Sequence, residues 1–186
     1  CNGLPSFDMV GLLSYDIKEA RERVKTAIKN SGFIIPPRRI TINFSPGNIR
    51  KTGTYFDMAI AVSILKALDI VDVDMEDKMF VGELSLNGEV VSVNGILPIV
   101  LHALENGIKQ CFIPEENIGE CQLIEGIDVI GVKNLNELVV FLSNEGYIEK
   151  SLPTIIKGNE EKSTGNDFCH IKGQVQAKKG AEETTN

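Results

Sequence analysis

The sequence of 186 residues contains no tryptophan, and aromatic side chains make up only 6% of it. Its longest apolar runs hold about five residues, well short of the ~18–20 that cross a membrane. No basic segment followed by an apolar core opens the chain, so no signal peptide is visible. We therefore expect a cytoplasmic protein with no membrane partner. The chain begins at Cys1 rather than at Met, and we interpret it as a processed or excised piece.

Disulfide and metal-binding patterns are also lacking. The two histidines are isolated, and no CxxC pair occurs among the four cysteines, which are Cys1, Cys111, Cys121 and Cys169. A disulfide framework needs a shorter chain that is denser in cysteine, and a zinc site needs clustered Cys and His ligands. We expect neither. Cys111 lies in an apolar run and Cys121 in a helical pattern, so both are predicted to be small core residues.

Common catalytic and nucleotide-binding motifs are absent as well: there is no GxGxxG, GxxxxGK[ST], HExxH or GxSxG. We expect no cofactor in this chain. Gly-rich turns at 45–48 and 51–54 could present backbone N–H groups to an anion at the start of the next helix. Ordinary loop geometry is the favoured interpretation of these turns. Asp57, in the first turn of that helix, suits the helix dipole and is expected to cap the helix.

What the sequence does have is ordinary globular composition, 42% hydrophobic and 24% charged, which excludes a wholly disordered chain. Its charge is polarised along the chain. Residues 1–51 carry nine Lys/Arg and four Asp/Glu, a net of +5, whereas residues 52–144 carry four and fifteen, a net of −11. The basic segment suggests a patch for phosphate groups. The alternative is a solvated helix face whose cations partner the acidic remainder.

Apolar periodicity predicts alternating strands and helices. Strands are expected at 6–10, 39–44, 79–84, 90–93, 110–113 and 128–132. Helices are expected between Ser14 and Gly32 and at 56–68, 96–105, 115–124 and 135–143. Asn87-Gly88 is typical of a hairpin turn. The fold class is therefore α/β (α+β), with a mixed sheet and about five helices.

The periodicity ends near residue 146. We expect a domain at 1–146, a linker at 147–166 that is rich in Gly, Asn, Ser, Glu and Lys, and the start of a second domain at 167–186.

Several blocks in a fixed order resemble one known family. They are residues 3–11, 18–24, 27–33, 37–43, 53–61, 82–84, 94–98 and 113–117. Together they resemble the amino-terminal domain of the ComM/YifB proteins, which are magnesium-chelatase-like AAA+ proteins often labelled ATP-dependent proteases. The resemblance covers nearly the whole chain.

The resemblance implies a fold like that of the Lon proteolytic domain and of the second domain of a small-subunit ribosomal protein. It also implies a first strand before Cys1 and an AAA+ module that starts at 167–186 and is truncated here. Within that start, Ile171, Gly173 and Gln174 would lie near the nucleotide. The full-length parent would use ATP and Mg²⁺, and this domain would contact its own AAA+ module and neighbouring subunits in a hexameric ring.

Lon-type peptidases use a Ser nucleophile activated by a neutral Lys. Alignment of the turn at 53–57 with that family places Tyr55 at the Ser position, and alignment of the next helical segment places Ile99 at the Lys position. Neither side chain can replace its counterpart. Thr54 is a neighbouring hydroxyl, but the segment around Ile99 supplies no Lys to activate it.

We therefore expect a non-catalytic accessory domain of an AAA+ motor. It would assist ring assembly or handle branched or single-stranded DNA in branch migration and recombination, and its candidate nucleic-acid contacts are Arg38, Arg39, Arg50 and Lys51. The alternatives are a Lon-like peptidase domain, which lacks the dyad, and a metal-chelatase subunit, whose name reflects the shared ATPase module.

Overall fold

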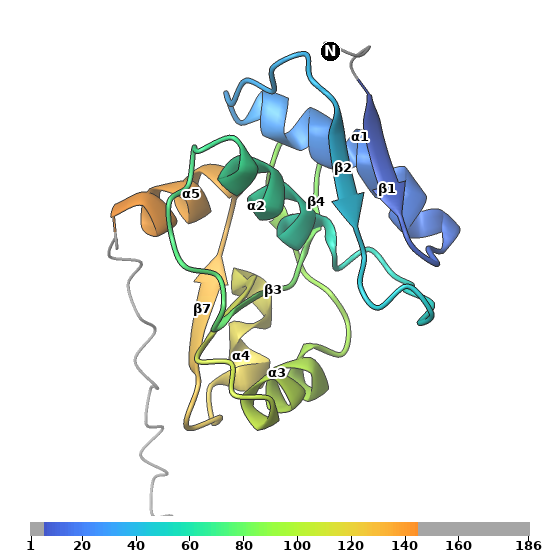
Figure 1. Ribbon diagram of the computed structural model, residues 1–186. Helices are drawn as coiled ribbons and strands as arrows, with labels where there is room; N and C mark the ends of the chain where they lie inside the picture. The colour runs from blue at the N-terminus through green and yellow to red at the C-terminus, as the bar shows by residue number, and fades with distance from the viewer. Residues whose placement is uncertain (1–5, 145–186) are drawn as a thin grey trace, which may run out of the picture. The chain divides into compact units, whose positions relative to one another are not determined.

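The computed structural model describes residues 6–144, in which strands and helices alternate as the sequence predicts (Figure 1). The strands are β1 (Phe7–Val10), β2 (Ile40–Asn43), β3 (Lys78–Phe80), β4 (Glu83–Leu84), β5 (Val90–Val91), β6 (Gln110–Pro114) and β7 (Asp128–Val132). The helices are α1 (Tyr15–Asn30), α2 (Asp57–Ala67), α3 (Ile96–Glu105), α4 (Ile118–Cys121) and α5 (Leu135–Asn144), with a 3-10 turn, η1 (Glu115–Asn117), before α4. The expected α/β class with five helices is confirmed.

Parallel and antiparallel pairing both occur, divided among three small sheets. β1 pairs with β2 in parallel, and β6 lies between β3 and β7 in a parallel three-stranded sheet. β4 and β5 form an antiparallel hairpin, closed by the predicted Asn87-Gly88 turn. No helix within residues 6–144 is long and apolar enough to cross a membrane.

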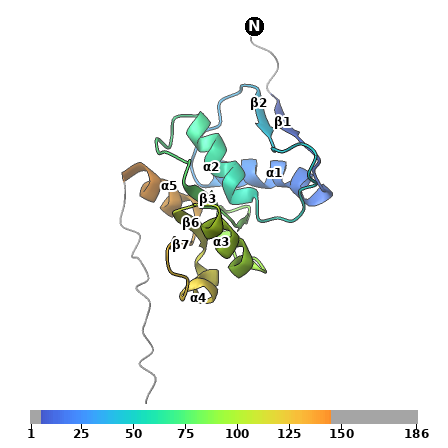
Figure 2. The same ribbon diagram turned by 60° about the horizontal axis from the view of Figure 1, so that its bottom comes forward.

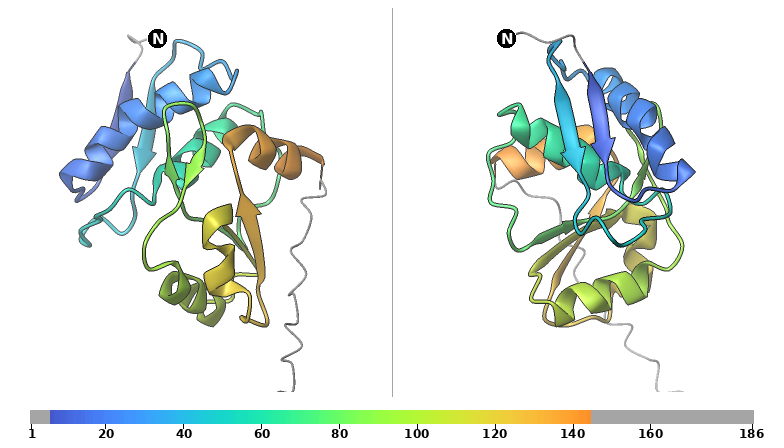
Figure 3. Two further views of the ribbon diagram at one scale, coloured as in Figure 1. Left: turned by 180° about the vertical axis from the view of Figure 1, so that it is seen from behind. Right: turned by 45° about the vertical axis from the view of Figure 1, so that its right-hand side comes forward.

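The amino-terminal part of the fold is the β1–α1–β2 unit. The buried residues of α1 recur at helical spacing, and they are Ile17, Ala20, Val24, Ala27 and Ile28. Ser14 occupies the N-cap position, as expected, although its hydroxyl makes no capping hydrogen bond. Gly32, at φ +88°, follows the end of the helix. Figure 3 shows β1 and β2 side by side with α1 covering one face of the pair.

The central strand β6 is buried on both faces because it separates two apolar clusters. Phe112 faces the cluster that includes α1, α2 and α5, and its ring stacks on Phe80 with the centroids 4.7 Å apart. Cys111 and Ile113 face the cluster built on α3 and α4. Figure 2 shows α2 and α5 on one side of β6 and β7 and α3 and α4 on the other. The prediction that Cys111 and Cys121 are core residues is confirmed.

Two predicted elements are wrong in their extent. The strand expected at 79–84 divides into β3 and β4, because the Gly82 N–H leaves the β6 ladder and donates to the Tyr55 carbonyl at 3.0 Å. A Cβ on Gly82 would lie 2.9 Å from Val90 Cγ1, so only glycine fits this close crossing. The helix expected at 115–124 ends at Cys121, and a short turn then carries Ile124 back onto the core.

The predicted linker at 147–166 and the predicted second domain at 167–186 lie outside the described residues.

Candidate functional site

The turn that leads into α2 holds Tyr55, the residue that the sequence predicts at the Lon nucleophile position. Gly53 has φ +92°, and a Cβ there would overlap the ring of Tyr55. This glycine therefore allows the Tyr55 ring to fold back over the turn. The ring also packs against Phe56, with the centroids 4.8 Å apart. The phenol is thus held as a packing group at the start of α2.

Tyr55 and Ile99 both pack against the apolar cluster of α3 and α4. The buried members of that cluster are Val81, Ile96, Val100, Ala103, Cys111, Ile113, Cys121 and Ile127. The ionisable side chains of α3 are His102 and Glu105, which lie 3.6 Å apart on the exposed face. α3 therefore presents no amine to the turn, and the two side chains that the sequence predicts at the Lon dyad positions take part in apolar packing.

The hydroxyl beside Tyr55 is bound by a carboxylate. Thr54 Oγ1 donates a hydrogen bond to Glu83 Oε2, on β4. Sequence reasoning named Thr54 but missed Glu83, which lies 29 residues further along the chain. The bond fastens the turn before α2 to the β4–β5 hairpin.

Directly beneath this turn lies a buried ion pair. Arg23 Nε and Nη2, on α1, donate to the two carboxylate oxygens of Asp57 at 2.6 and 3.0 Å. The Leu84 N–H donates to the same carboxylate at 3.1 Å. Asp57 is fully buried, and the Arg23 side chain is 19% exposed. The carboxylate thus joins α1, α2 and β4.

The environment of this ion pair shifts the pKa values of both side chains. Burial raises the pKa of the Asp57 carboxyl, and the hydrogen bonds from Arg23 and from the Leu84 N–H oppose that rise. The hydrogen bond that Arg23 donates to Asp57 in turn raises the pKa of the Arg23 guanidinium. The expectation that Asp57 caps α2 is wrong: Phe56 holds the N-cap position, and the carboxylate makes no capping bond. The sequence did contain one signal for the ion pair: Asp57 is a charged residue in an otherwise apolar helix, and a buried charge requires a partner.

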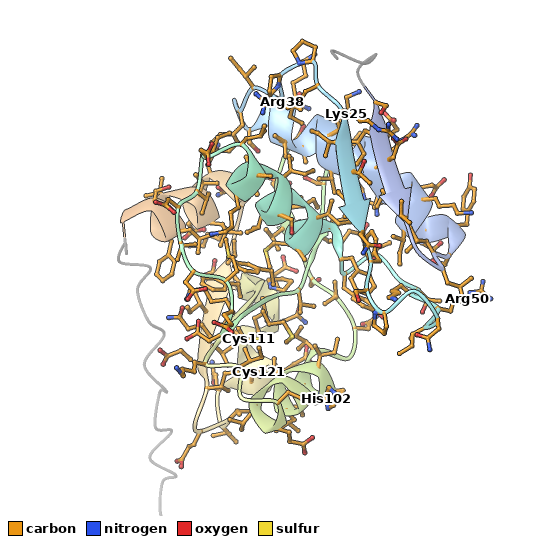
Figure 4. All side chains as sticks on the ribbon, in the orientation of Figure 1. Lys25, Arg38, Arg50, His102, Cys111 and Cys121 are labelled. Carbon is orange, nitrogen blue, oxygen red and sulfur yellow. The ribbon has the colours of Figure 1, made fainter. Side chains whose placement is uncertain are left out.

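The candidate nucleic-acid contacts divide between the two ends of the β1–α1–β2 unit. Arg38 and Arg39 precede β2 and lie at the amino ends of the parallel strands, beside the last turn of α1. Arg50 and Lys51 follow β2 and lie at the carboxyl ends, where the Ser14 N–H donates to the Lys51 carbonyl at 3.0 Å. In Figure 4, Lys25 and Arg38 lie at one end of the unit and Arg50 at the other.

These cations also differ in what they bind. The Lys51 ammonium is turned inward and donates to the backbone carbonyls of Phe44 and Pro46, so it stabilises its own loop. Arg39 lies 3.4 Å from Asp8 in an exposed ion pair. Arg38 and Arg50 are exposed, and within residues 6–144 their side chains have no hydrogen-bond or ion-pair partner.

Metal-binding clusters and the predicted anion-binding turns can be compared with the described part of the chain. Within it, no group of three His, Cys, Asp or Glu side chains is placed to hold a metal ion. The loop that contains the Gly-rich turns has its lysine committed to its own carbonyls, so that lysine is not free for a phosphate. Ile171, Gly173 and Gln174 lie outside the described residues.

Comparison of the sequence with known proteins identifies the family of this chain. Residues 1–117 match the family model described as subunit ChlI of Mg-chelatase. The chain is 33% identical to YifB of Escherichia coli over 183 residues, which cover 98% of this chain and 35% of that protein. It is 33% identical to the competence protein ComM of Haemophilus influenzae over 182 residues, 96% of this chain and 35% of ComM.

A partial match links the same fold to proteases. Lon protease 2 of Bacillus subtilis is 34% identical over 123 residues, which cover 66% of this chain and 22% of that enzyme. The fold defines a domain of the Lon-like class. The chain belongs to the magnesium-chelatase-like AAA+ family of the ComM/YifB type. It spans about a third of the length of the family relatives that it matches, 35% for both YifB and ComM.

Proposed function

We propose that this chain is a non-catalytic accessory domain of a ComM-type AAA+ motor. In the full-length parent it assists ring assembly or handles DNA during branch migration and recombination. The main observation behind the proposal is the packing of Tyr55 and Ile99 against the apolar cluster of α3 and α4. A hydroxyl nucleophile needs an adjacent base; the phenol of Tyr55 is no equivalent of a serine hydroxyl, and Ile99 supplies no base.

A role in DNA handling draws on two further observations. One similar protein is named a competence protein. The β1–α1–β2 unit also exposes cations on a chain whose net charge is −7. Phosphate contacts give sequence-independent binding without base readout, which suits a motor that moves along DNA.

The proposed cofactors and partners belong to the parent. ATP and Mg²⁺ would bind to its AAA+ module. The proposed partners of this domain are that module, neighbouring subunits of a hexameric ring, and branched or single-stranded DNA. The proposed compartment is the cytoplasm.

The ATPase activity of the full-length parent tests this proposal. It is measured with forked DNA, plain duplex DNA or an unfolded protein, in the intact parent and in a parent that lacks this domain. We expect forked DNA to stimulate the intact parent most, and this stimulation to fall when the domain is removed. Stimulation by unfolded protein alone would refute the DNA role.

The second candidate function is peptidase activity, favoured by the Lon match and by the hydrogen bond between Thr54 and Glu83. A serine- and threonine-reactive probe applied to the native parent separates it from the first. We expect no labelling of the domain above that of a Thr54→Val variant. Labelling that disappears in this variant would identify Thr54 as a nucleophile and overturn the non-catalytic assignment.

A further inference from the structure

The last two turns of α1 and the loop that follows carry exposed cations. Lys25 and Lys29 stand four residues apart on the exposed side of α1, and Arg38 follows in the loop before β2. All three are exposed, and none has an ion-pair partner within residues 6–144. Two like charges at this spacing destabilise a helix slightly, so helix stability does not explain the arrangement. Lys29 alone has a structural benefit, from its place at the negative end of the helix dipole.

Three other cations of the same unit are paired with carboxylates, whereas Lys18, near the opposite end of α1, is exposed. Arg21 pairs with Glu22 at 3.1 Å, Arg23 with the buried Asp57, and Arg39 with Asp8. The acidic segment after α2 includes the exposed Asp69, Asp72 and Asp74, which make no ion pair with Lys25, Lys29 or Arg38. Three cations at the amino end of the unit therefore remain available to an outside partner.

The loop between them presents one large apolar side chain to solvent. Ile34 is 82% exposed, whereas its neighbours Phe33 and Ile35 pack against the core. The Phe33 N–H donates to the Ile28 carbonyl at 3.1 Å, which fixes the start of the loop on the end of α1. Four residues span at most about 14 Å, so Ile34 lies within that distance of Arg38.

We propose that this surface, defined by Lys25, Lys29, Ile34 and Arg38 and here termed the amino-end surface, binds the sugar–phosphate backbone of DNA in the parent. The proposal rests on the proposed function and assigns its DNA contact to one end of the domain. The cations contact phosphate oxygens, and Ile34 contacts the apolar face of a sugar or an unstacked base. A lipid surface fits less well, because a membrane-bound helix needs an apolar face, whereas the exposed side of α1 is charged.

A matched pair of double variants in the full-length parent tests the assignment. Lys25→Ala with Arg38→Ala removes two cations from the amino-end surface. Lys109→Ala with Lys133→Ala removes two exposed lysines outside the β1–α1–β2 unit, each of which is paired with a carboxylate. All four side chains are exposed, so both variants should keep the wild-type unfolding midpoint.

The measurement is affinity for forked DNA as a function of salt, by fluorescence anisotropy. Each phosphate contact adds about 0.9 to the slope of log affinity against log salt. The first variant should therefore lower the slope by about 2. Between about 50 and 200 mM salt, the factor by which the variant loses affinity should be about ten times smaller than the factor for the wild type. The control variant should leave the slope unchanged.

Each other result overturns the assignment in a distinguishable way. An unchanged slope in the Lys25/Arg38 variant, with DNA-stimulated ATPase still dependent on the domain, would refute the surface and leave the proposed function standing. Equal slope changes in both variants would indicate long-range charge effects rather than contacts. Binding to phosphatidylserine vesicles that Ile34→Asp abolishes, with an unchanged DNA slope, would assign the surface to a membrane instead.

Discussion

The buried ion pair between Arg23 and Asp57 should be the most sensitive point of the fold. Replacing Asp57 by Asn keeps the volume of the side chain but removes its charge. The Arg23 guanidinium then loses both of its charged hydrogen bonds, at 2.6 and 3.0 Å, while only 19% of its side chain reaches solvent. The amide oxygen can still accept the hydrogen bond from the Leu84 N–H.

The expected cost follows from this geometry. Breaking a buried pair by removing one partner costs about 3–5 kcal/mol, because the remaining charge stays buried without compensation. Since the amide of the Asp57→Asn variant would retain one acceptor, we expect the lower end of that range, about 3 kcal/mol. For a chain of this size, each kcal/mol lowers the melting temperature by about 2–4 °C, so the expected shift is about 6–12 °C.

Thermal unfolding followed by circular dichroism measures the shift, with two companion variants. Asp8→Asn breaks the exposed pair with Arg39 and should cost at most about 1 kcal/mol. The double variant Arg23→Met with Asp57→Asn removes the unpaired charge, keeps an acceptor for the Leu84 N–H and should recover part of the lost stability. The reasoning is refuted if Asp57→Asn costs no more than Asp8→Asn.

Three further predictions concern separate parts of the fold. Gly88→Ala should lower the free energy of unfolding by about 1–3 kcal/mol, because Gly88 has φ +83° and a Cβ would overlap the Ser31 hydroxyl. Gly119→Ala, where a Cβ meets nothing within 4 Å, should be neutral or stabilising. Urea titration of both variants measures the free energy of unfolding, and equal decreases in the two variants would contradict this prediction. Burial raises the pKa of the Cys111 thiol to about 12, so in a variant with no other cysteine, iodoacetamide should label it at least about a hundredfold faster in urea than in the native state. Hydrogen bonding from the adjacent lysine lowers the pKa of Asp77 below its ordinary value of 3.8. Ionised Asp77 therefore stabilises the fold above that value, and the contribution is lost as the pH falls through the lowered pKa. Unfolding midpoints of wild type and Asp77→Asn should differ at neutral pH and converge in acid; a constant gap would contradict the assignment.

Much of the fold could be predicted from the sequence, because periodicity reflects burial within one element. The apolar stripe of α1 and the Asn87-Gly88 turn are local properties of a few neighbouring residues, and the structure confirms both. The blocks that resemble the ComM/YifB family likewise lie within short segments, and the comparisons confirm the family.

The extent of elements at close crossings was not predictable in the same way. Residues 79–84 have the apolar pattern of one strand, yet at Gly82 the chain turns from β6 toward the start of α2. That change depends on the Tyr55 carbonyl, which lies 27 residues earlier in the sequence. A partner so distant leaves no periodic signal.

The sequence by itself determined the order of the elements and the family. Tertiary structure alone decided which charged side chains are paired within the fold and which remain exposed to solvent. It buries Asp57 against Arg23 and turns Lys51 onto its own loop, while Arg38 stays exposed beside the end of α1. The physical reason is that the interaction of a charge depends on its distance from other charges and from water, and folding sets both distances.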